Sequence, residues 1–176
     1  MAVVTIKSLT ITDQDASPRV PSQSGKGAGF RAKEFDAFAQ ATNGDSAASK
    51  YILFRVPSSI RVKDVILEAE ALGAACTVNY GWYFASRVED IGAGQVAGAV
   101  INASFHAAAV AQTAAILPTN IVNAAGGTYT VDKRSQPLWQ ALGLATDPGG
   151  KFDFVATVAV AVAATGKIYA KVGVAE

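Results

Sequence analysis

The chain has 176 residues, of which 51% are apolar and only 16% are charged, and its formal net charge is +1. This length suffices for one domain, or one domain with an arm, without help from metals or disulfides. The near-neutral charge creates no field that would attract nucleic acid or an anionic membrane, so neither is expected as a partner. Ordinary soluble domains carry ~25% charged residues, so the low value indicates that another protein covers part of the surface.

The N-terminal third is expected to contain a strand, an arm and a second strand. Residues Val3 to Thr12 alternate as a strand with an irregularity would. From Asp13 to Gly29 the chain is rich in Ser, Gly and Pro and has few large apolar groups, which predicts an extended arm or long loop. Phe30 to Ala41 fits a strand better than a helix, because a turn cluster and a clear strand follow it.

Two strands joined by a corner come next. Tyr51 to Val56 is a continuous apolar run, as in a strand buried on both faces. Pro57 has no backbone N–H and must end that ladder, so residues 57–59 form the corner. From Ile60 to Ala71 the apolar residues change parity near Asp64, which predicts a β-bulge.

An aromatic strand is predicted from Ala74 to Ala85, where Gly81 would let a neighbouring backbone approach. Residues Arg87 to Ala125 are expected to form an insertion between strands, containing either a short helix or a strand pair. The apolar side chains of the aromatic strand share one parity: Val78, Tyr80, Trp82 and Phe84.

The C-terminal part is expected to contain a short helix and a hairpin. Ser135 to Leu144 has helical spacing, with Ser135 as N-cap. Phe152 to Val162 and Ile168 to Val174 alternate around residues 164–166, which predicts a hairpin and not a membrane span. About seven strands then form an antiparallel, jelly-roll-like β-sandwich with one short helix. The expected organisation is an N-terminal strand and extended arm over residues 1–29, then one domain over 30–176 with an irregular insertion at about 87–125.

Catalytic and metal-binding patterns are weak. His106 is the sole histidine and no Gly-x-Ser-x-Gly elbow accompanies it, so an ordinary histidine is expected. Cys76 is the sole cysteine, which excludes an internal disulfide and a cysteine-based zinc site and predicts a buried free thiol. Gly-rich residues 25–29 and 92–98 lack the ending of a phosphate loop. We therefore expect no catalytic residue, no cofactor, no metal and no secretory signal.

One pair of carboxylates leaves an alternative open. Glu68 and Glu70 lie two residues apart on a predicted strand and so face the same side, as in a solvated polar face or, less simply, a glycosidase pair. Together with Trp82, Tyr80 or Tyr83 as a platform they would form a carbohydrate-binding or hydrolytic β-sandwich. Alternation places Trp82 with Val78 and Phe84, which favours a core position.

Three stretches of the sequence follow one another in a recognisable order. These are FRVPSSIRVKDVIL after NGDSAAS, then NYGWYF, then LWQALGLATDPGGKFDFVATV before the terminal strands. Together they resemble the capsid decoration (cement) and minor capsid structural proteins of tailed bacteriophages. The likeness covers roughly the C-terminal two thirds of the chain, and the Ala-rich residues 96–125 depart from it. It implies a β-domain with an arm, no enzymatic activity, and binding to the outside of the shell formed by the major capsid protein, often as trimers.

The resemblance implies that residues 13–29 are an arm tying neighbouring subunits, in a virion protein made in the host cytoplasm. A tail, neck or head-fibre component is the alternative within viruses. A modest basic group lies in and beside the arm and suits an acidic protein surface, although a solvated loop fits its composition equally. The candidate partner-binding residues are Arg19, Val20, Lys26, Phe30 and Arg31.

Overall fold

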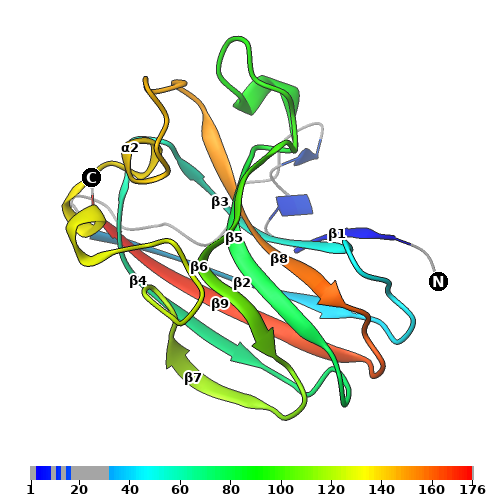
Figure 1. Ribbon diagram of the computed structural model, residues 1–176. Helices are drawn as coiled ribbons and strands as arrows, with labels where there is room; N and C mark the ends of the chain where they lie inside the picture. Colours follow the sequence, from blue (N-terminus) through cyan, green and yellow to red (C-terminus); the bar gives the residue numbers. More distant parts are fainter. Residues whose placement is uncertain (1–2, 9–10, 13–14, 17–31, 176) are drawn as a thin grey trace.

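The computed structural model describes residues 3–8, 11–12, 15–16 and 32–175, and these form two β-sheets packed face to face (Figure 1). All strand pairs are antiparallel except the short parallel pair of β1 with β3. The predicted mainly β sandwich with a short helix is confirmed. Sheet A has, in spatial order, β1 (Thr5–Lys7), β3 (Lys50–Pro57), β8 (Lys151–Val160), β5 (Thr77–Phe84) and β6 (Val100–Ala111). Sheet B has β2 (Ala32–Ala41), β9 (Gly166–Ala175), β4 (Arg61–Ala69) and β7 (Ile116–Asn120).

The corner after β3 carries the chain from one sheet to the other, as the sequence predicted. β3 is buried along almost its whole length and pairs with β8, whereas β4 pairs with β9. The Ser58 hydroxyl donates a 2.6 Å hydrogen bond to the Asp147 carboxylate and so fixes the corner against a distant loop. The predicted bulge in β4 is confirmed by a register shift between Val62 and Asp64. The Asp64 carboxylate accepts a hydrogen bond from the Gly173 backbone N–H there.

The last two strands do not form the predicted hairpin. Both strands exist, but β8 lies between β3 and β5 in sheet A, and β9 lies between β2 and β4 in sheet B. Residues 161–165 therefore cross between the sheets. Alternating strands separated by a short turn have the same local pattern in either arrangement, so burial against the two sheets decides the outcome.

Three other segments differ in extent from expectation. The first strand is confined to Thr5–Lys7, and Ser135 ends a 3-10 turn, η2 (Val131–Ser135), instead of capping a helix. The helix α2 (Leu138–Ala141) is a single turn that begins after Pro137. Residues 87–125, expected to form an irregular insertion with a short helix or a strand pair, contain η1 (Val88–Asp90) and two strands that join different sheets, β6 in sheet A and β7 in sheet B.

Aromatic side chains fill the space between the sheets. The Phe54 and Phe154 rings stack with centroids 4.8 Å apart, and the Trp82 ring meets Phe154 edge-on at 5.0 Å. Such pairs add about 0.5–1.5 kcal/mol beyond the burial of their area. Tyr80 and Trp82 are fully buried, as alternation along β5 predicted, and the Cys76 thiol is buried and free.

Gly81→Ala should open the contact between β5 and β6. A Cβ at this position would lie 2.0 Å from the Asn102 carbonyl oxygen and 2.5 Å from the Ala103 carbonyl carbon. Because both obstacles are backbone atoms, we expect the free energy of unfolding to fall by at least about 2 kcal/mol in urea denaturation. Ala159→Ser at an exposed site on β8 is the control and should change it by less than about 0.5 kcal/mol. Equal stability of the two variants would disprove the close approach.

Candidate functional site

A buried ion pair forms the centre of the most extensive polar site in the described residues. Arg55 on β3 lies opposite Asp153 on β8 in the strand register. Its Nε donates to Asp153 Oδ1 at 2.6 Å and its Nη2 donates to Asp153 Oδ2 at 3.1 Å. The Arg55 side chain is 0% exposed. A two-point guanidinium–carboxylate contact of this kind is among the stronger hydrogen-bonded pairs in proteins.

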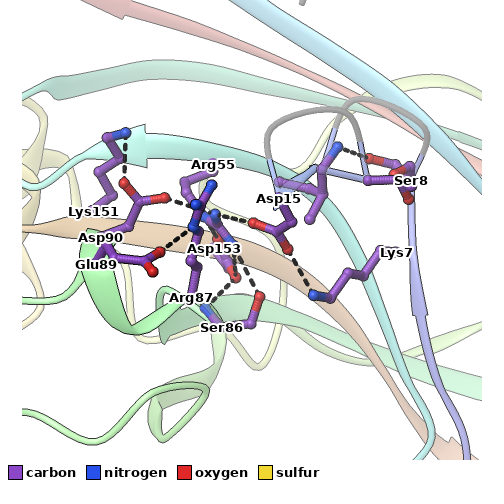
Figure 2. A network of polar contacts seen from close by, with 12 residues as sticks. Lys7, Ser8, Asp15, Arg55, Ser86, Arg87, Glu89, Asp90, Lys151 and Asp153 are labelled. Carbon is purple, nitrogen blue, oxygen red and sulfur yellow. Dashed lines mark hydrogen bonds and ion pairs between the residues drawn. The ribbon is translucent and has the colours of Figure 1, made fainter. Parts of the chain in front are cut away.

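Two further carboxylates bind the same guanidinium from segments outside the two strands. Arg55 Nη1 donates to Asp15 Oδ1 at 2.7 Å and to Asp90 Oδ2 at 2.9 Å. Figure 2 shows the three aspartates arranged around the Arg55 head group. Asp15 and Asp90 each also bind a lysine. Lys7 Nζ lies 2.6 Å from Asp15 Oδ2, and Lys151 Nζ lies 2.9 Å from Asp90 Oδ1. The network therefore joins the N-terminal segment, the η1 turn and both strands.

The charges of the network hold two of its carboxylates, those of Asp15 and Asp90, ionised. Burial alone would raise the pKa of Asp15, but hydrogen bonds and charges from Lys7 and Arg55 outweigh burial and lower it. Asp90 behaves in the same way, with Lys151 and Arg55 lowering its pKa against the effect of burial. Carboxylates that stay ionised and fully hydrogen-bonded are poor general acids and bases near neutral pH. The arrangement is suited to fastening segments together.

Apolar contacts fasten the same N-terminal segment over the outer face of sheet A. Ile11 is fully buried in a cluster separate from the main core, with Ile52, Tyr83 and Val155. The Ser8 backbone N–H donates to the Ile52 carbonyl at 2.7 Å, and the Ser8 hydroxyl donates to the Leu53 carbonyl. The described residues 3–8, 11–12 and 15–16 thus cover part of this face with the protein's own chain.

His106 is a structural residue, as expected for a lone histidine. The Trp82 indole N–H donates to its Nε2 at 2.9 Å, so Nδ1 carries the proton and donates to the Val122 carbonyl at 3.0 Å. Burial lowers the pKa of His106 to about 4, although the Val122 contact raises it slightly. The ring is therefore neutral at physiological pH and links β5 and β6 to the segment after β7.

The aromatic platform of the carbohydrate-binding alternative is absent from the described surface. Trp82 and Tyr80 are fully buried in the core, and Tyr83 is buried on the outer face of sheet A, where Ile11 and Val155 contact it. Glu68 and Glu70 are exposed on the outer face of sheet B, as the polar-face interpretation predicted. The rings beside them are Phe38 and Tyr169, which sequence reasoning did not connect with these carboxylates.

The candidate partner-binding residues lie outside the part of the chain that the structure describes. The part of the arm from residue 17 to residue 29 lies outside the described residues, although Asp15 near its start belongs to the ionic network. Within the described ranges, no group of three or more His, Cys, Asp or Glu side chains has a metal-binding arrangement. No helix in those ranges is long and apolar enough to cross a membrane. The five candidates that lie outside are Arg19, Val20, Lys26, Phe30 and Arg31.

Comparison with known proteins finds the fold in bacteriophage capsids. No protein-family model and no curated protein matches the sequence. A chain of the capsid of Ralstonia phage GP4 is 15% identical, with a TM-score of 0.52 and 98% of each chain covered. A chain of the cyanophage Pam1 capsid asymmetric unit is 18% identical, with a TM-score of 0.50, covering 92% of this chain and 96% of that one. The resemblance to capsid-associated phage proteins is thereby confirmed at the level of the fold.

Proposed function

We propose that this protein is a non-enzymatic structural component of a bacteriophage virion, and specifically a decoration or cement protein on the outer capsid surface. The observation that carries the proposal is the similarity of its fold, over 92% and 98% of its length, to chains of two phage capsid structures. The buried ionic network, which ties the N-terminal segment to two strands, suits a protein that works through contacts.

The partner in this proposal is the major capsid protein, whose subunits the chain would join. Many copies that each bury on the order of 1,000 Å² across subunit joints would stiffen a shell without any single strong bond. The chain itself would act as a homo-oligomer, with a trimer as the favoured state. We retain the proposal that residues 1–29 are an N-terminal strand and arm and residues 30–176 one domain. Its partner-binding residues are Arg19, Val20, Lys26, Phe30 and Arg31.

Binding to capsids that lack the protein tests this function. Purified protein should saturate such capsids at a fixed number of copies per major capsid subunit, and electron microscopy should place these copies on the outer surface. Sedimentation velocity of the free protein should give the mass of a trimer. Failure to bind, or density on the tail or neck of the virion, would contradict the decoration role.

A further inference from the structure

On the outer face of sheet B, two aromatic side chains and a carboxylate form a row across three strands. Phe38 on β2, Tyr169 on β9 and Glu68 on β4 are direct partners in the strand register and so lie side by side. Phe38 is 51% exposed, and Leu117 on the neighbouring β7 is 78% exposed. We call the surface formed by Phe38, Tyr169, Glu68, Glu70 and Leu117 the acid–aromatic face. Its residues line an open depression of about 390 Å³.

Carboxylate groups outnumber ammonium groups around the rings of Phe38 and Tyr169. Burial first, and then the charges of Asp36, Glu68 and Glu34, raise the pKa of Tyr169, although the charge of Lys171 acts to lower it. Lys171 forms a 2.9 Å ion pair with Glu34. Lys167 lies with its Nζ 5.7 Å from the centre of the Phe38 ring. Four carboxylates, those of Glu34, Asp36, Glu68 and Glu70, therefore face the two ammonium groups of Lys167 and Lys171, although the whole chain carries a net charge of +1.

Rings beside carboxylates form a surface that favours cationic side chains. A guanidinium can stack on an aromatic ring and at the same time donate hydrogen bonds to a carboxylate, which ammonium groups do less well. The exposed Leu117 adds apolar area of the kind found at the centre of protein contacts. The chemistry of the acid–aromatic face thus selects a basic protein surface that bears arginine.

The two outer faces of the sandwich differ in what covers them. On sheet A, Ile11 from the N-terminal segment packs against Tyr83, and Asp15 from the same segment binds Arg55. On sheet B, Phe38 and Leu117 remain exposed to solvent. Large apolar side chains grouped on a surface and rimmed by charges are typical of protein interaction sites. Sheet B therefore offers the more suitable contact face among the described residues.

We infer that the acid–aromatic face is a second surface, beside the arm, by which this protein docks onto the shell, and that it contacts a basic, arginine-bearing patch of the capsid. The inference rests on the proposed function and adds the contact face and the charge of the partner. Charge complementarity of this kind speeds association and fixes the register of docking. Binding must then weaken as salt concentration rises, because the attracting charges are screened.

Titration of purified variants onto capsids lacking the protein tests the inference. The double variant Phe38→Ser, Glu68→Lys should raise the Kd at least about 30-fold, because it removes an aromatic anchor and reverses a charge. The matched control Val131→Ser, Asp132→Lys changes the same residue classes on η2, where Val131 is 74% exposed, and should stay within about 2-fold of the unaltered protein. Circular dichroism and urea denaturation should show both variants folded, since every altered side chain is exposed.

A second variant separates charge from packing. Glu68→Gln alone should bind more weakly at low salt and lose affinity less steeply as NaCl increases. Binding of Phe38→Ser, Glu68→Lys with unchanged affinity, or an unchanged salt slope for Glu68→Gln, would overturn the docking face and leave the decoration role standing. Failure of the unaltered protein to bind capsids would overturn both proposals.

Discussion

Arg55→Leu should lower the free energy of unfolding by about 3–5 kcal/mol, the cost of breaking a buried ion pair from one side. The substitution leaves Asp153 and Asp90 in a buried environment without the guanidinium that compensates their charge. It also removes the contact to Asp15, so the N-terminal segment should detach more readily. Urea denaturation measures the first effect, and faster proteolytic cleavage near residues 8–16 measures the second.

Two further variants show whether charge compensation is the cause. Arg55→Leu combined with Asp153→Leu should recover part of the lost stability, because the double change removes both charges of the central pair. Lys151→Met alters a partly exposed member of the network that pairs with Asp90, and its effect should stay within about 1 kcal/mol. If Arg55→Leu destabilised the protein no more than Lys151→Met, the network would not have the stabilising role assigned to it.

Acidification from pH 7 to pH 4 should remove up to about 3 kcal/mol of stability through His106 alone. In the unfolded chain this histidine takes up a proton near its usual pKa of 6.5, whereas burial lowers the folded pKa to about 4. Since the unfolded state binds more protons in this interval, falling pH favours unfolding. Protonation would also place an N–H on Nε2 directly facing the Trp82 indole N–H.

His106→Gln isolates that contribution. A glutamine oxygen can accept from the Trp82 N–H, while the side chain has no group that titrates in this range. The variant should therefore lose less stability than the unaltered protein between pH 7 and pH 4, whatever its stability at pH 7. Denaturation curves at several pH values give both slopes. Equal slopes would show that the folded ring is protonated as easily as the unfolded one.

Sequence patterns predicted the scaffold where burial on one or both faces left a local signature. The buried run of β3, the corner after Pro57 and the parity change in β4 all appear in the structure. Trp82 was placed in the core by alternation alone. The pairing of β8 with β9 was wrong, because sheet partners are chosen by packing across the whole molecule and leave little trace in neighbouring residues.

The ionic network was missed for a related reason. Arg55 stands between Phe54 and Val56 in a strand predicted to be buried on both faces, which was a signal that buried carboxylates must compensate it. Its three acidic partners come from three separate segments of the chain, and no spacing rule connects them. The acid–aromatic face was missed likewise, since Phe38 and Glu68 meet only through β9, which lies between their strands.

The order of strands within the sheets affects how the chain folds during its synthesis. Among the described strands, β5 and β6 are the one pair of sheet neighbours that also follow each other in sequence. β9 lies between β2 and β4 and is the last strand to be synthesised. Until it emerges, the backbone groups on the edges of β2 and β4 that will pair with it remain unpaired. Most paired strands are far apart in the sequence, so pairing them closes long loops, which slows folding. We therefore expect sheet B to form late, after an interval in which nascent chains can associate through their open strand edges.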